Sequence, residues 1–311
     1  MKKVLYSSFL ILLTALSVKG QTYFNMVHKF PASGCVPYCN PNPDFNQIKP
    51  ISYTDALKAF EHLSKKSNAQ FNYPQGGCPE RALILHYLLD SMKIPNFRIW
   101  IFAPSRLIEN DTRKIFIYDK NKLTTDSQNK IEWDFHVAPC VLSKNQNGKI
   151  DTLVFDPSID GDKPLRHIEW LKSIGNHEIA EYTFLDGKYY QFNKQNNGNS
   201  NVINGYFYPY ENFAYDNLWL EKMLSLNDVA YEMFEKYVKD KDRNLQDVKD
   251  IMAVIGNSAT LKEVLDFKDG KPASSKIRYL ASKYPKFSSD MWTMYSTKLV
   301  YWTQRIEKFR Q

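Results

Sequence analysis

The sequence of 311 residues lacks long apolar segments, with one exception at its start. The apolar run of residues 4–16 follows Lys2 and Lys3 and ends before Gly20, which is the layout of a secretory signal peptide. This run is too short to span a membrane stably, and no later stretch has about 18 consecutive apolar residues. No cysteine directly follows the run, which argues against a lipid anchor. We therefore expect residues 1–20 to be a cleaved signal peptide and the product to be periplasmic or secreted.

The sequence also has no arginine-rich block, no repeat of fixed period and no strong excess of one charge. The formal net charge of +7 includes Lys2, Lys3 and Lys19 of the expected signal peptide, where no acidic residue balances them. The remaining charges are scattered, so we expect no nucleic-acid partner. The six histidines show no H-x-x-x-H spacing, so no zinc site is expected.

Cysteine is scarce, with only Cys35, Cys39, Cys78 and Cys140 in the chain. In an oxidising compartment four cysteines usually form two disulfides, and Cys35 and Cys39 are close enough in sequence to close a small loop. If Cys78 is instead a free nucleophile, the other three leave one thiol unpaired. The cysteine count alone leaves both arrangements open.

The hydrophobic pattern predicts an α+β fold with a helical C-terminal region. Residues 1–20 are followed by an irregular leader at 21–50, rich in proline, asparagine and glycine. A catalytic domain is expected over residues 51–205, with amphipathic helices at 54–68 and 79–93. Alternation predicts its strands at 96–103, 114–119, 131–143, 150–158, 181–186 and 188–193. Helical spacing then predicts an all-helical region at 206–311, beyond a polar loop at 194–205.

The segment PQGGCPERA, residues 74–82, places Cys78 at the start of the second predicted helix. The unpaired N–H groups and dipole of a helix N-terminus favour a thiolate and can stabilise an oxyanion. Gly76 and Gly77 leave the approach to the sulfur open. These features suit a nucleophile, although a structural cysteine or a disulfide partner is the commoner use of such a residue.

Among the histidines, His136 is the best candidate for a base that activates Cys78. His86 lies two turns along the Cys78 helix, and the remaining histidines lie in predicted loops, the leader or the first helix: His28, His62, His167 and His177. His136 lies in the strand 131–143, where alternation predicts two faces. One face carries Trp133, Phe135 and Val137, and the other carries Asp134, His136, Ala138 and Cys140. A lone histidine in a strand is more often a hydrogen-bonded structural group.

Asp156 lies in VFDPS, at the end of the strand that returns from a hairpin turn at Gly148. Neighbouring strands of a hairpin bring their side chains together, so Asp156 can face His136. A thiolate, an imidazole and a carboxylate that orients the imidazole form a nucleophilic triad. The alternative for Asp-Pro-Ser is a turn or a local cap.

Three segments closely resemble the motifs of bacterial protein glutaminases, also called protein-glutamine deamidases. They are GGCPERA, WDFHVAPCV and VFDPS, and the resemblance covers roughly residues 50–190. It implies a papain/transglutaminase-like core in which a helix carries Cys78 and an antiparallel sheet carries His136 and Asp156. The leader before Cys78 is short for the family, the segment from Cys78 to His136 is long, and the C-terminal helical region is extra.

The resemblance implies that the chain deamidates glutamine side chains of proteins or peptides and releases ammonia. Cys78 would be the nucleophile, His136 the general base and acid, and Asp156 the orienting partner, with no metal or organic cofactor. The backbone N–H of Cys78 is the expected oxyanion donor, and Gln75, Gly77 and Trp133 are weaker candidates for oxyanion or substrate contacts.

Three alternatives remain at this level. A transglutaminase-like acyltransferase or a cysteine peptidase would use the same core. A non-catalytic secreted binding protein would instead oxidise Cys78 to Cys140 or to a leader cysteine.

Overall fold

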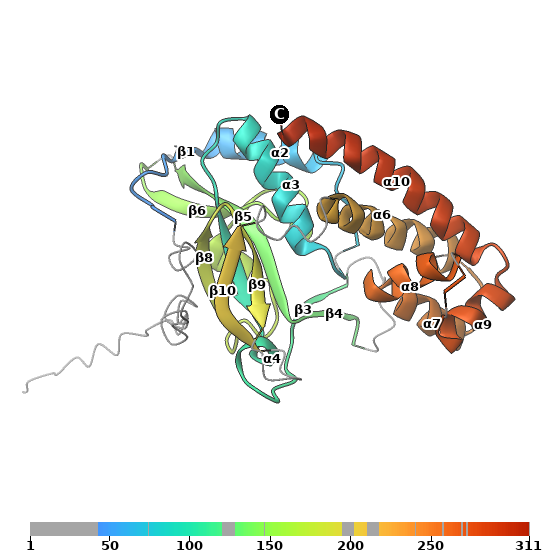
Figure 1. Ribbon diagram of the computed structural model, residues 1–311. Coiled ribbons are helices and arrows are strands. Elements are labelled where there is room, and N and C mark those ends of the chain that lie inside the picture. Colours follow the sequence, from blue (N-terminus) through green and yellow to red (C-terminus); the bar gives the residue numbers. More distant parts are fainter. Residues whose placement is uncertain are drawn as a thin grey trace, which may run out of the picture.

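A computed structural model describes residues 43–310, apart from residues 74, 120–127, 146, 195–201, 210–217, 240, 257, 269 and 272. The expected signal peptide and most of the leader, with Cys35 and Cys39, lie outside these described residues. Within them the chain combines helices with a mixed but mainly antiparallel sheet, and a group of helices follows at the C-terminal side (Figure 1).

The central sheet has six strands in the order β7-β6-β5-β2-β8, with β1 beside β5. All its pairs are antiparallel except β1 with β5. Its strands are β1 (Ile51–Ser52), β2 (Phe97–Phe102), β5 (Phe135–Lys144), β6 (Ile150–Val154), β7 (Leu165–Arg166) and β8 (Glu181–Asp186). Two separate hairpin pairs join β3 (Ile115–Tyr118) to β4 (Lys130–Trp133) and β9 (Tyr189–Lys194) to β10 (Ile203–Pro209).

Both faces of the sheet are covered, which explains why every residue of β2 is buried. Trp100 and Phe102 face one core, which also contains helices α2 (Tyr53–Lys66) and α3 (Cys78–Ser91). Ile99 and Ile101 face a second core on the opposite side, with Trp170 of α5 (His167–Lys172). The two-residue alternation of a strand therefore separates two hydrophobic layers. A further short helix, α4 (Pro104–Leu107), follows β2.

The helices near the C-terminus share a core of their own. They are α6 (Trp219–Tyr237), α7 (Leu245–Ile255), α8 (Ser258–Lys268), α9 (Ser275–Lys283) and α10 (Phe287–Arg310). Figure 1 shows α10 running the length of this group and ending beside α2 and α3. There the amide of Asn68 donates to the Tyr301 hydroxyl at 2.6 Å. No helix in the described ranges is both long and apolar enough to span a bilayer.

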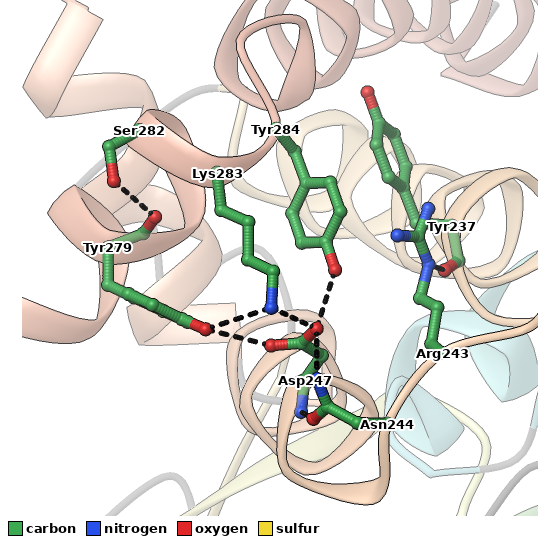
Figure 2. Close-up of polar contacts among 8 residues, drawn as sticks. All are labelled: Tyr237, Arg243, Asn244, Asp247, Tyr279, Ser282, Lys283 and Tyr284. Atoms are coloured by element: carbon green, nitrogen blue, oxygen red, sulfur yellow. Dashed lines mark hydrogen bonds and ion pairs between the residues drawn. The ribbon is translucent and has the colours of Figure 1, made fainter.

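Asp247 of α7 ties helix α9 into this helical group (Figure 2). Its carboxylate accepts hydrogen bonds from Lys283 Nζ at 2.5 Å and from the hydroxyls of Tyr279 and Tyr284, each at 2.9 Å. Asn244 caps α7 by accepting from the Asp247 N–H at 2.9 Å. The hydrogen bond from Lys283, followed by those from the tyrosines, lowers the pKa of Asp247 to about 2. This carboxylate is fully occupied by donors and acts as a structural link.

Two expectations for the chain path need correction. The predicted strand 131–143 is two strands in different sheets, because the chain bends at Asp134, whose side chain is held by Ser105 at 2.8 Å and Arg106 at 3.1 Å. Trp133 therefore does not share a face with Phe135 and Val137. The expected start of an all-helical region at residue 206 also falls inside β10, which pairs with β9 as far as Pro209.

Candidate active site

The structure brings His136 and Asp156 together in the interior of the protein. Nε2 of His136 and Oδ2 of Asp156 are 2.7 Å apart, and the two residues are 1% and 6% exposed. The register of the hairpin produces this pairing: Cys140 of β5 lies opposite Val154 of β6, and the Phe155 N–H donates to the Pro139 carbonyl at 2.8 Å. The expected facing of the histidine and the carboxylate is therefore present.

Two indole rings fix the plane of the His136 imidazole. Trp133 stacks on it with ring centroids 4.4 Å apart and an angle of 12°, and Trp170 lies near the ring at 5.7 Å and 19°. The Trp170 Nε1–H also donates to Asp156 Oδ2 at 2.9 Å. Since Nε2 faces the carboxylate, the other ring nitrogen, Nδ1, is left buried with no hydrogen-bond partner among the residues described.

The electrostatics of the pair favour an ionised Asp156. Burial alone would raise the pKa of its carboxyl, but the charge and hydrogen bond of His136 and the hydrogen bonds from Trp170 and Ser158 outweigh burial. The pKa of Asp156 is therefore lowered below its ordinary value. An ionised carboxylate at Nε2 holds the proton on that nitrogen and leaves Nδ1 as a proton acceptor.

Cys78 lies at the start of α3 and lines one small cavity together with His136 and Asp156. Burial raises the pKa of the Cys78 thiol to about 12, although the nearby Arg81 charge and a hydrogen bond from the Val137 backbone act in the opposite direction. The sequence predicts a thiolate favoured by the helix N-terminus, and here burial is the stronger effect. The resting thiol is therefore protonated at neutral pH and needs a base.

Arg81, one turn along α3 from Cys78, interacts both with Cys78 and with the glycine segment that precedes it. Its side chain is buried, its Nη1 donates to the Gly76 carbonyl at 2.5 Å, and its charge interacts with Cys78 and Asp156. The neighbouring Glu80 is also buried, and burial raises the pKa of its carboxyl. The GGCPERA motif therefore places a buried ionisable pair directly beside the thiol.

The cavity at Cys78 has a volume of about 10 Å³, which is close to the room one water molecule occupies. Phe71 and Ser158 line this cavity and also line a neighbouring cavity of about 340 Å³. The lining of the larger cavity is mixed, with Ile117, Tyr118 and Ile131 beside polar residues such as Asn72 and Asp119. Phe71 is thus a wall shared by the triad cavity and the larger cavity.

The three weaker candidates from the sequence also lie near this region. Gly77 precedes α3 in the left-handed conformation, with φ of 77°. Trp133 is stacked on His136. The Gln75 amide has buried nitrogen and oxygen atoms that lack a hydrogen-bond partner in the described part of the chain. Trp170 and Phe71 were not predicted, because no local pattern marks a residue that reaches a site through tertiary packing.

The cysteines of the described region are not oxidised. Cys78 and Cys140 are both free and buried, so the Cys78–Cys140 disulfide of the binding-protein alternative is not formed in this structure. Within the described ranges, no group of three or more histidine, cysteine, aspartate or glutamate side chains is arranged to hold a metal ion.

Comparison with known proteins gives one family match. Residues 54–174 match the model of a family described as glutaminase. This confirms the resemblance predicted from the motifs, and the matched segment contains Cys78, His136 and Asp156. No curated protein sequence matches the chain.

Several solved structures are similar at low identity. The NMR structure of protein-glutaminase from Chryseobacterium proteolyticum is 16% identical with a TM-score of 0.40, over 63% of this chain and 95% of that one. A crystal structure of protein-glutaminase gives 16% and 0.40, over 63% and 96%. A crystal structure of pro-protein-glutaminase gives 16% and 0.42, over 72% and 70%.

Proposed function

We propose that this chain, whose resemblance to the protein glutaminase family is confirmed over residues 54–174, is a thiol amidohydrolase that deamidates glutamine side chains of proteins or peptides. The observation that carries the proposal is the buried His136–Asp156 pair at 2.7 Å in the same cavity as Cys78. We also propose that the enzyme acts outside the cytoplasm, after removal of residues 1–20.

The first chemical step is attack on the γ-carboxamide carbon of glutamine. His136 Nδ1 accepts the proton of the Cys78 thiol, and the sulfur forms a bond to the carbon. Asp156 stabilises the imidazolium through Nε2–H, and the two stacked indoles keep the ring in the plane required for both contacts. Proton transfer to His136 accounts for how a thiol with a pKa of about 12 becomes nucleophilic.

The tetrahedral intermediate carries a negative oxygen that needs donors. The Cys78 N–H belongs to the first turn of α3, where backbone N–H groups have no partner within the helix. The buried Gln75 amide is a second candidate donor. His136 then protonates the leaving nitrogen, ammonia departs, and a thioester remains on Cys78.

Water completes the cycle. His136 takes a proton from a water molecule, the resulting hydroxide attacks the thioester, and the product glutamate leaves as the thiol recovers its proton. A glutamine side chain does not fit the 10 Å³ cavity, so substrate entry requires Phe71 or another wall residue to move. A transglutaminase on the same core would differ in the second step, where an amine and not water attacks the thioester. A peptidase would differ in the first step, where the thiol attacks a backbone amide and not a side-chain amide.

The deciding experiment measures ammonia release from a glutamine-rich protein by the chain of residues 21–311. Cys78→Ala is compared with Cys140→Ala, a matched control at the other buried free cysteine. We expect ammonia and uncleaved, deamidated protein from the parent and from Cys140→Ala, and neither from Cys78→Ala. Cross-linked products would show that the enzyme is an acyltransferase, and cleaved products would show that it is a peptidase. Activity in Cys78→Ala would exclude Cys78 as the nucleophile.

A further inference from the structure

The segment that leads into Cys78 is held by the C-terminal helices. Tyr73 is 3% exposed and belongs to the helical core, where its ring lies 6.3 Å from that of Tyr231 and 6.4 Å from that of Phe234. Both partners are on α6. Five residues before the nucleophile, the chain is therefore anchored in a region outside the segment that matches the glutaminase family.

A second contact from α6 is made by Asn227, at Gly77 itself. A Cβ atom placed on Gly77 would lie 1.8 Å from Nδ2 of Asn227, so the Asn227 amide occupies the space that a side chain at Gly77 would need. Gly77 has a positive φ of 77° and directly precedes Cys78. Arg81 of α3 holds the neighbouring Gly76 through its hydrogen bond to the carbonyl oxygen. Two side chains from different helices thus hold the two glycines.

The polar atoms of this contact do not stabilise the fold. Asn227 Nδ2 and the Tyr73 hydroxyl are both buried and have no hydrogen-bond partner within the described residues. Burying a donor without an acceptor destabilises the folded state, and such local violations concentrate where function requires them. Replacing this unpaired amide by an apolar side chain is expected to leave stability unchanged or to raise it, so stability does not explain the asparagine.

We propose that Asn227 is a positioning residue for the deamidation reaction: its amide packs against Gly77 and fixes the point from which α3 and Cys78 begin. This inference rests on the proposed function and assigns a role to the C-terminal helices. Glycine is the most conformationally free residue, so the backbone immediately before the nucleophile needs an external support. The Asn227 amide provides that support from α6.

The space around Asn227 allows it to be replaced by an apolar side chain of similar size. A cavity of about 260 Å³ lies beside the contact and is lined by Gly77, Asn227 and apolar residues such as Met223, Leu226 and Ile255. A leucine at position 227 therefore has room to turn away from Gly77 without overpacking. Asn227→Leu removes the amide and also removes the unpaired buried donor.

The test measures kcat and KM for deamidation, the rate of Cys78 alkylation by iodoacetamide between pH 6 and 10, and the thermal midpoint. Alkylation is assigned to Cys78 by mapping the modified peptide. For Asn227→Leu we expect kcat to fall on the order of ten- to a hundredfold with KM nearly unchanged, because a small displacement of the nucleophile has an effect of this size. We also expect a changed alkylation profile and an equal or higher thermal midpoint. Asn227→Ala serves as the second variant if the leucine variant does not fold.

Asn244→Ala is the matched control, because it removes an asparagine that caps α7 and does not touch the Cys78 loop. We expect it to lower the thermal midpoint and to leave kcat and the alkylation profile at the parent values. Parent values of kcat and alkylation in both Asn227 variants would overturn the proposal, as would an equal loss in Asn244→Ala. A parent chain without activity on any glutamine substrate would refute the proposed function, while the alkylation profiles would still decide whether Asn227 positions Cys78.

Discussion

The sheet region and the C-terminal helices each bury a carboxylate against a tryptophan. In the sheet region the Trp170 Nε1–H donates to Asp156 Oδ2 at 2.9 Å, and in the helical region the Trp302 Nε1–H donates to Asp228 Oδ2 at 3.0 Å. Asp156 is 6% exposed and Asp228 is 7% exposed. The hydrogen bond and the burial are therefore nearly the same in the two regions.

The pKa values of the two carboxyls nevertheless shift in opposite directions. Burial raises the pKa of Asp228 to about 6, and the negative charge of Glu232 adds to the rise. Lys298, 3.8 Å away, and the hydrogen bond from Trp302 act in the opposite direction but do not outweigh burial. Burial also acts on Asp156, but His136 at 2.7 Å outweighs it and lowers the pKa. The comparison shows that the tryptophan hydrogen bond alone does not set the direction of the pKa shift, which depends on the other partners: His136 and the Ser158 N–H at Asp156, and the more distant Lys298 with Glu232 at Asp228.

The largest expected effect comes from removing the negative charge of Asp156. Asp156→Asn should lower kcat/KM for glutamine deamidation on the order of 10²- to 10⁴-fold, because His136 loses the group that fixes its tautomer and stabilises its charged form. Asp228→Asn is the matched variant and should keep the parent rate. Steady-state kinetics on one glutamine peptide measures kcat/KM for both variants. Equal values for the two variants would show that Asp156 has no catalytic role that Asp228 lacks.

The next effect concerns the two tryptophan hydrogen bonds. Trp170→Phe should lower kcat/KM by about tenfold, which corresponds to one hydrogen bond to a charged acceptor. Trp302→Phe removes the corresponding bond in the helical region and should reduce thermal stability with little change in kcat/KM. An activity loss of the same size in both variants would show that the effect is one of general stability.

The sequence predicts the local parts of this site well. The pairing of His136 with Asp156 depends on one hairpin with a short turn at Gly148, so strand alternation and turn chemistry suffice to bring the two side chains together. The start of α3 at Cys78 follows in the same way from Gly77 and Pro79. Such features depend on residues that are close in the chain.

The parts that the sequence does not predict depend on packing between distant segments. Trp170 reaches Asp156 from a short helix, and Asn227 reaches Gly77 from α6, with no periodic pattern to mark either contact. The pKa of Cys78 is a further case: the helix N-terminus is visible in the sequence, but the burial that outweighs it is set by the whole fold. The bend at Asp134 likewise depends on side chains from α4.

A smaller effect on stability is expected from Asp228. Its pKa in the folded state, about 6, lies above its ordinary value of 3.8, so the folded state binds more protons between these values. Stability should therefore decrease as the pH rises from about 4 to 6 and stay lower above that range. Asp228→Asn removes this titration and should stabilise the protein at pH 7 by about 1 kcal/mol, because the lost interaction with Lys298 offsets part of the gain.

Urea denaturation of the parent and of Asp228→Asn at pH 4 and pH 7 measures this difference. Lys298→Met is the useful companion: removing the cation should raise the pKa of Asp228 further and extend the pH-dependent loss of stability to higher pH. If Asp228→Asn is less stable than the parent at pH 7, the attraction of Lys298 fully offsets the cost of burying the Asp228 charge. The pKa values of Asp228 and Asp156 would then differ less than inferred.

The smallest effect is expected at Asp247, whose carboxylate accepts hydrogen bonds from four side chains, those of Asn244, Tyr279, Lys283 and Tyr284 (Figure 2). Its pKa of about 2 lies below the ordinary value of 3.8, so its contribution to stability is present above about pH 4 and is lost as the pH falls through 2. Asp247→Asn should lower the thermal midpoint by a few degrees at pH 7 and leave deamidation at 25 °C unchanged. The midpoints of the variant and the parent should converge as the pH falls below 2, where the Asp247 carboxyl becomes neutral like the amide that replaces it. A difference that is the same at pH 2 and pH 7 would show that packing of the side chain, and not its charge, holds α9 against α7.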